Sequence, residues 1–204
     1  MRPDAEKARY DGAHTQGQRG FTRFGTEQAK DAKVPDLKEF WHVARELPKG
    51  HKFSDIMGEN LYVSEVPGWK ESTNAMYAAL DTFGLEILSA IATNLKLDPR
   101  FFDTTVQDGN SILRALHYPP QSGDPDGIRA EAHGDINTIT LLLGAEEAGL
   151  QALTRDGTWL DVNPPPNCVV INVGDMLDRL TNGYLPSTTH RVLNPKADRA
   201  HLPR

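Results

Sequence analysis

At positions 132–143 the chain reads Ala-His-Gly-Asp-Ile-Asn-Thr-Ile-Thr-Leu-Leu-Leu, a short polar motif followed by a β-branched and apolar run. The run predicts a buried strand from Ile136 to Leu143, because such residues are enriched in strands. Alternate side chains of an extended chain lie on the same face. We therefore expect His133 and Asp135 on one side of the backbone, with Gly134 facing away.

A later histidine, His190, can join this pair if its strand runs alongside. Two imidazoles and one carboxylate on one face of a metal ion leave the other face open, which is the arrangement of mononuclear non-haem iron oxygenases. A single His-x-Asp is a weak signal, because short motifs recur by chance and most histidines are surface or core residues. Together with the segments around them, His133, Asp135 and His190 are predicted to be the metal ligands and catalytic residues.

Four short motifs follow the His-x-Asp in order. They are Gly149-Leu150-Gln151, Gly157-Thr158-Trp159, Asn172-Val173-Gly174-Asp175 and Ser187-Thr188-Thr189-His190-Arg191-Val192. The whole series resembles the isopenicillin N synthase-like family of Fe(II)/2-oxoglutarate-dependent oxygenases, in its bacterial branch. The resemblance is strong from about Leu113 to Arg204.

Short apolar segments separated by turns follow from Ser111 onward, which is typical of an all-β sandwich or jelly roll. The resemblance sharpens this to a mainly β fold with N-terminal helices and a double-stranded β-helix (jelly-roll) core. It implies a single oxygenase domain over residues 1–204. Within it, residues 1–110 would form an irregular segment and supporting helices, and residues 111–204 the jelly-roll core.

The resemblance also implies an enzyme, a non-haem iron 2-oxoglutarate-dependent dioxygenase. Its cofactor would be Fe(II), with 2-oxoglutarate as co-substrate. Dioxygen would oxidise a small-molecule substrate, and succinate and carbon dioxide would be released.

Members of the family hold the far carboxylate of 2-oxoglutarate with an Arg-x-Ser pair, because a guanidinium can grip a carboxylate with two hydrogen bonds. Arg204 is the best match for this arginine. Arg191 is the alternative, although it adjoins His190 and should face the other side of the strand. The Tyr118 hydroxyl is a second candidate contact, with a purely structural role as a core aromatic equally open.

The N-terminal half contains one further block that resembles the family. Residues 36–43, Asp-Leu-Lys-Glu-Phe-Trp-His-Val, predict a short strand or turn in which His42 is structural. Apolar residues recurring every three or four positions predict a helix from Lys70 to Leu95. Four of them are expected to be buried: Leu80, Phe83, Ile87 and Ile91. Residues 111–118 predict the first core strand, ended by two prolines.

Composition fits a soluble enzyme, with 38% hydrophobic residues and a net charge of −6. No basic cluster favours nucleic acid or an anionic membrane as partner. No apolar stretch approaches the roughly 20 residues that span a bilayer, and no signal peptide is evident. The lone Cys168, expected to be buried, excludes an intramolecular disulfide and fits a reducing compartment. We expect a monomer in the cytoplasm.

Several segments usual at the ends of family members do not occur here, including the serine expected after Arg204. The chain is therefore expected to be truncated at both ends. Three alternatives to an active oxygenase follow. The chain could be a catalytically impaired fragment, a jelly-roll binding module that keeps the metal site, or an iron oxidase of the same family that does not use 2-oxoglutarate.

Overall fold

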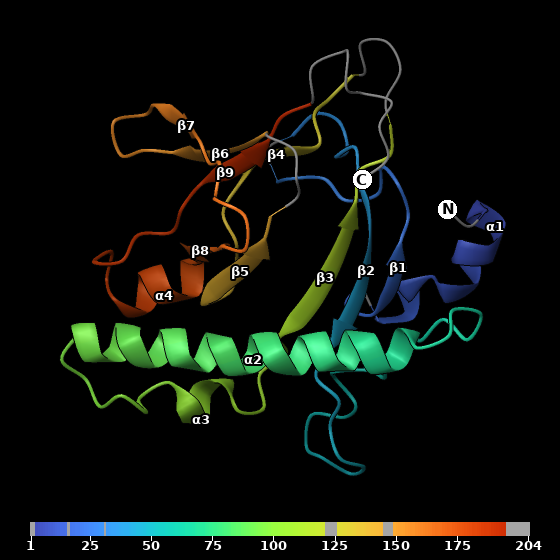
Figure 1. Cartoon of the computed structure of the whole chain (residues 1–204), viewed down its shortest axis with the longest axis horizontal. Coiled ribbons are helices and arrows are strands. Elements are labelled where there is room, and N and C mark those ends of the chain that lie inside the picture. The colour runs from blue at the N-terminus through green and yellow to red at the C-terminus, as the bar shows by residue number, and fades with distance from the viewer. Residues whose placement is uncertain (1–2, 16, 31, 121–125, 145–148, 195–204) are drawn as a thin grey trace. The chain divides into compact units, whose positions relative to one another are not determined.

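The computed structural model describes residues 3–15, 17–30, 32–120, 126–144 and 149–194 (Figure 1). The chain divides into two compact units. Unit 1 consists of residues 1–23 and 40–116, and unit 2 of residues 24–39 and 117–204. Each unit is described by itself below, and the single domain expected over residues 1–204 stays a prediction.

Unit 1 combines a small sheet with one long helix. Its first elements are α1 (Asp4–Lys7) and the 3-10 helices η1 (Ala8–Tyr10) and η2 (Gly12–Thr15). The strands β1 (Gly20–Thr22), β2 (Glu39–Ala44) and β3 (Ile112–His117) form a sheet in the order β1-β2-β3, counted with unit 1 although Glu39 and His117 fall in unit 2. The helices α2 (Trp69–Asn94) and α3 (Asp103–Val106) complete it.

Aromatic side chains form the core of unit 1. Phe21 and Trp41 are paired across β1 and β2, and both are buried together with Val43. The Trp41 ring contacts Tyr10 at 5.4 Å and Trp69 edge-on at 5.5 Å between centroids. Such tilted and edge-to-face pairs stabilise a core beyond their buried area. Trp69 opens α2, so this cluster also anchors the first turn of the helix.

The block at residues 36–43 supplies β2, which confirms the expected strand, and all six residues of β2 are buried. His42 uses both of its ring nitrogens within unit 1. Its Nδ1 donates to the Gly17 carbonyl at 2.7 Å, and its Nε2 accepts from Arg114 Nε at 2.7 Å. The expectation that His42 is structural is confirmed.

The long helix is also confirmed, with α2 running from Trp69 to Asn94. The prediction that four apolar residues of this helix are buried was wrong. Leu80, Phe83, Ile87 and Ile91 are half-buried, whereas the buried residues are Leu88 and Ala92. These two lie one position beyond Ile87 and Ile91, which is about 100° around the helix. Because α2 is apolar on more than one face, the spacing of its apolar residues alone could not identify which face is buried.

By length and composition alone, α2 is the one helix among the described residues that could cross a membrane. This differs from the expectation that no segment is long and apolar enough. Core helices of water-soluble proteins meet the same criterion. Polar side chains tie α2 to unit 1, since Asp81 pairs with Arg45 at 2.7 Å and the Tyr77 hydroxyl donates to the Ser111 carbonyl.

Replacing Leu88 with alanine should lower the free energy of unfolding by about 2–4 kcal/mol, because the side chain is 5% exposed and would leave a cavity. Leu85→Ala is the matched control on the same helix, since Leu85 is 37% exposed. We expect it to cost less than about 1 kcal/mol. Urea unfolding of both variants measures the difference, and equal losses would contradict the observed orientation of α2.

Unit 2 is built from antiparallel strands and one short helix. The strands β4 (Ala130–His133), β9 (His190–Val192), β6 (Leu150–Leu153) and β7 (Trp159–Asp161) form a sheet in the order β4-β9-β6-β7. The strands β5 (Ile139–Leu143) and β8 (Val169–Val173) form a second pair, and α4 (Asp175–Leu180) follows β8. The chain is thus mostly β with few helices, as expected.

Three details of these strands differ from the expectations. The strand expected at 136–143 begins at Ile139, because residues 136–138 form a bend that accepts amides from Gly174 and Met176. Its residues are half-buried or exposed, where burial was expected. Cys168, expected to be buried, is exposed just before β8. The strand expected at 111–118 is confirmed as β3, and it pairs with β2 in the sheet of order β1-β2-β3.

Candidate metal centre

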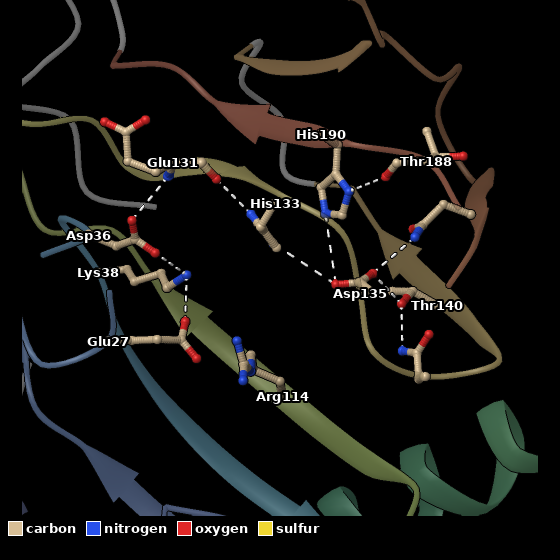
Figure 2. A network of polar contacts seen from close by, with 12 residues as sticks. Glu27, Asp36, Lys38, Arg114, Glu131, His133, Asp135, Thr140, Thr188 and His190 are labelled. Carbon is tan, nitrogen blue, oxygen red and sulfur yellow. Dashed lines mark hydrogen bonds and ion pairs between the residues drawn. The ribbon is translucent and has the colours of Figure 1, made fainter. Parts of the chain in front are cut away.

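The two histidines predicted as ligands face each other across neighbouring strands of unit 2. His133 ends β4, His190 begins β9, and the antiparallel pairing places them opposite each other with ring centroids 4.4 Å apart. Asp135 lies two residues beyond the end of β4, and its Oδ1 is 3.9 Å from His133 Nε2 and 4.0 Å from His190 Nε2. Figure 2 shows the three side chains converging. The structure therefore brings together the three residues that the motif singled out.

Both imidazole rings are oriented by a backbone carbonyl two residues earlier in the chain. His133 Nδ1 lies 2.6 Å from the Glu131 carbonyl oxygen, and His190 Nδ1 lies 3.0 Å from that of Thr188. A carbonyl oxygen only accepts hydrogen bonds, so each Nδ1 carries the proton. With Nδ1 bonded to the backbone, Nε2 is the ring nitrogen that faces Asp135 and can bind a metal.

The carboxylate of Asp135 is oriented in the same way. Its Oδ2 accepts hydrogen bonds from Thr140 Oγ1 at 2.5 Å and from Asn172 Nδ2 at 2.9 Å, which leaves Oδ1 facing the histidines. Burial raises the pKa of Asp135, but the hydrogen bonds from Asn172 and Thr140, with the nearby histidines, outweigh it and lower the pKa. Asp135 is therefore a carboxylate at neutral pH.

Gly134 is closely packed against two side chains behind the ligands. A Cβ at this position would lie 3.0 Å from Asp175 Oδ1 and 3.2 Å from Ser187 Oγ. The Asp175 amide also donates to the Asp135 carbonyl at 2.7 Å. The start of α4 therefore holds the backbone between the two ligands of the His-x-Asp.

The donor set fits a divalent metal ion. One ligand atom from each of His133, Asp135 and His190 lies within 4.8 Å of the others. A first-row ion binds such atoms at about 2.0–2.2 Å, so three ligand atoms on one face of it lie about 3 Å apart. Asp135 Oδ1 is 3.9 and 4.0 Å from the two Nε2 atoms, so the side chains would close by about 1 Å around a bound ion. Two neutral nitrogens and one negative oxygen on one side form the 2-His-1-carboxylate set.

Arg191 points away from these ligands, as expected for the neighbour of His190 on a strand. Its Nε donates to Gln151 Oε1 at 2.9 Å, and its guanidinium lies 4.0 Å above the Trp159 ring. Gln151 in turn donates to Asp161 at 2.8 Å. The Gly-Leu-Gln and Gly-x-Trp motifs thus hold Arg191 in place.

Of the two residues expected to contact 2-oxoglutarate, Tyr118 and Arg204, the structure describes only Tyr118. Tyr118 is half-buried in unit 2, and the guanidinium of the buried Arg129 lies 5.3 Å from its ring. Arg204 lies outside the described residues. Both contacts stay predictions.

Sequence reasoning missed the roles of Asn172 and Thr140, which orient Asp135. Asn172 belongs to the Asn-x-Gly-Asp motif, but nothing in the motif indicated that its side chain contacts Asp135. Thr140 lies in the apolar run after the His-x-Asp, where a lone hydroxyl gave no indication of its target. The hydroxyl of Thr140 also accepts from Asn137 Nδ2 at 2.8 Å.

Comparison with known proteins places this site in a family. Residues 109–203 match the model of the 2OG-Fe(II) oxygenase superfamily, and residues 1–65 match that of the N-terminal region of non-haem dioxygenases, described as "non-haem dioxygenase in morphine synthesis N-terminal". A C-terminally truncated Neurospora crassa protein, solved in apo form, is 31% identical with a TM-score of 0.77, and the match covers 99% of this chain and 68% of that one. The chain belongs to the 2OG-Fe(II) oxygenase superfamily.

Other members of the superfamily are similar over nearly the whole chain. A 2OG-Fe(II) oxygenase family protein from Caulobacter crescentus is 56% identical with a TM-score of 0.90, covering 100% of this chain and 66% of that one. A 2-oxoglutarate-Fe(II) type oxidoreductase from Aspergillus fumigatus is 31% identical over 94% of this chain and 60% of its own length. The chain thus spans 60% and 54% of the length of two curated relatives that it matches.

Proposed function

We propose that this chain binds one Fe(II) through His133 Nε2, His190 Nε2 and Asp135 Oδ1, and that it oxidises a small organic molecule with 2-oxoglutarate and dioxygen, releasing succinate and carbon dioxide. One observation carries the proposal. In each of the three side chains the other polar atom is already hydrogen-bonded to the protein, so that the three remaining donor atoms face one another.

The residues of the chain contribute binding and orientation. Both histidines are oriented by their Nδ1 contacts so that Nε2 is left to bind a metal, and Asp135 supplies the negative charge that favours a divalent cation. Iron, when bound, supplies the redox chemistry between dioxygen, 2-oxoglutarate and the substrate. Because all three protein ligands come from one side, the opposite side is left for the 2-oxo acid and dioxygen.

Relatives support the class of substrate. Structures of the full-length Neurospora crassa protein contain alpha-KG, which is 2-oxoglutarate, and one contains thymine as well. A small, uncharged organic ring is therefore a reasonable first substrate class to screen with this chain. The proposal includes Tyr118 and Arg204 as contacts of the co-substrate, with Arg191 as the weaker alternative because its Nε is already bonded to Gln151.

Several finer assignments belong to the same proposal. The antiparallel pairs β4-β9-β6-β7 and β5-β8 support a double-stranded β-helix core in unit 2. The 56% identity with the Caulobacter crescentus protein supports a place in the bacterial branch of the isopenicillin N synthase-like family. We further propose a monomer in the cytoplasm, on the composition of the chain.

Anaerobic titration tests the proposal. Adding Fe(II) and then 2-oxoglutarate to the chain should produce the weak visible charge-transfer band of a chelated 2-oxo acid, and His190→Ala should abolish it. Absence of Fe(II) binding by the parent chain would overturn the metal site. Binding of Fe(II) without the band would instead favour an iron oxidase that does not use 2-oxoglutarate.

A further inference from the structure

Unit 2 contains a cluster of three charged side chains, the buried Asp36 and Lys38 and the half-buried Glu27, which we call the Asp36 cluster. Lys38 Nζ lies 2.8 Å from Asp36 Oδ2 and 2.6 Å from Glu27 Oε2. Asp36 is 2% exposed and Lys38 is 4% exposed. Burying charges is costly unless they are paired with good geometry. None of the three is a predicted metal ligand, so metal binding by these side chains does not explain why charges are buried here.

Lys38 stays charged within the cluster. Burial lowers its pKa, but the negative charge of Glu27 and the hydrogen bonds to Asp36 and Glu27 outweigh this and raise the pKa. A protonated Lys38 fixes Oδ2 of Asp36, so the rotation of the Asp36 carboxylate is set. The other oxygen of Asp36 is then aimed in a defined direction.

That other oxygen reaches the strand that carries the first metal ligand. Asp36 Oδ1 accepts a hydrogen bond from the Glu131 amide at 3.0 Å, and the Glu131 carbonyl oxygen is the partner of His133 Nδ1. Figure 2 shows this series of contacts from Glu27 through Lys38, Asp36 and Glu131 to His133. The adjacent backbone contact from the Leu37 amide to the Ile128 carbonyl, 3.1 Å, holds the two segments together.

The register of β4 explains why Glu131 needs this partner. Ala130 pairs with Val192 and His133 with His190, so that two residues of β4, Glu131 and Ala132, lie opposite one residue of β9. This is a β-bulge, and a bulge takes a backbone group out of the regular ladder. Asp36 accepts the Glu131 amide at this point.

The second ligand is supported differently. The carbonyl that orients His190 belongs to Thr188, whose own amide donates to the Val173 carbonyl at 3.2 Å. The contacts of Thr188 described here are thus made between backbone groups, whereas the Glu131 amide depends on a charged side chain, Asp36. Removing one carboxylate should affect one ligand and leave the other in place.

We propose that Asp36, fixed by Lys38, is a positioning residue for the metal ligand His133. It holds the bulged backbone at Glu131, so that the Glu131 carbonyl keeps the His133 ring in the Nδ1-protonated form with Nε2 facing Asp135. The expected change in metal affinity rests on the proposed function, in which His133 is a ligand. The orientation of the His133 ring is argued from the hydrogen bonds of Asp36 and Glu131.

The test compares Asp36→Ala with the parent chain by two measurements. In metal-free protein labelled with 15N-histidine, the Nδ1–H signal of His133 should shift or be lost, while that of His190 stays unchanged. Titration with Co(II), followed by visible absorption, should show weaker binding by up to about 10-fold, the lower end of the range for losing a direct hydrogen-bond partner of a ligand, because Asp36 acts through Glu131. Asp36→Asn, which keeps the shape and one acceptor oxygen, should act in the same direction more weakly.

Glu27→Gln is the matched control, because it removes a carboxylate from the same Lys38 and leaves the Asp36 contact to Glu131 in place. It should leave the His133 signal and the Co(II) affinity close to those of the parent. Equal effects of Asp36→Asn and Glu27→Gln would overturn the inference, as would unchanged behaviour of Asp36→Ala. If the parent fails to bind Co(II), the proposed function is wrong, and the His133 signal still decides the positioning role because it requires no metal.

Discussion

Replacing Asp135 with alanine is expected to lower the affinity for Mn(II) or Co(II) by more than about 100-fold. Losing an outer hydrogen-bond partner of a ligand costs roughly 10–100-fold, and this substitution removes a ligand itself. It also leaves two neutral imidazoles with no negative charge to attract a divalent ion. Isothermal titration of the parent and of Asp135→Ala measures the change.

Two further variants make this result specific. Asp55→Ala removes an exposed carboxylate of unit 1 and should bind the metal as the parent does. Asp135→Asn keeps the shape that Thr140 and Asn172 contact, and it separates the loss of charge from the loss of packing. If Asp135→Ala binds the ion as tightly as the parent, the three residues do not form the metal site.

Replacing Gly174 with alanine is expected to lower the free energy of unfolding by about 3 kcal/mol, at the upper end of the range for overpacking. A Cβ at Gly174 would lie 2.2 Å from the Asn137 carbonyl oxygen and 2.8 Å from its carbon, and this backbone cannot move aside as a side-chain end could. Gly174 and Met176 also donate hydrogen bonds to the bend that follows Asp135. Displacing this bend should shift Asp135, so the metal affinity should fall as well. Urea unfolding and Co(II) titration measure the two effects.

Gly144→Ala is the control for the change in residue type. A Cβ there would meet Pro164 Cγ at 3.4 Å, an ordinary contact with a side chain. We expect a change within about 0.5 kcal/mol. Equal midpoints of unfolding for the two alanine variants would show that the start of α4 is not packed against the bend as the structure has it.

The features that could be predicted from the sequence are those set by local periodicity or by a motif. The spacing of apolar residues was sufficient for α2, and the His-x-Asp with the later His190 was sufficient to name three side chains that converge. Alternation did not locate the bend at 136–138, because its cause is the pair of amides that Gly174 and Met176 donate to it. Such contacts join segments far apart in the chain.

The same limit applies to the supports of the site. Asn172 reaches Asp135 from β8, and Asp36 reaches Glu131 across almost half of the chain. Residues 36–43 were recognisable as a block, yet no pattern within them indicates which amide the Asp36 carboxylate meets. Burial on α2 was misjudged for a related reason, since an apolar helix does not reveal which side its neighbours cover.

The pairing of His133 opposite His190 has a consequence for how the sheet assembles. An ion held by both histidines can bind only when β4 and β9 are in this register, because a shift by one residue would turn a ring to the other face. Metal binding and correct strand alignment then form one linked equilibrium. At a free metal concentration of 100 times Kd, the linkage would favour the aligned state by about 2.7 kcal/mol. A bound ion would thus stabilise one register of β4 and β9 over the others during folding.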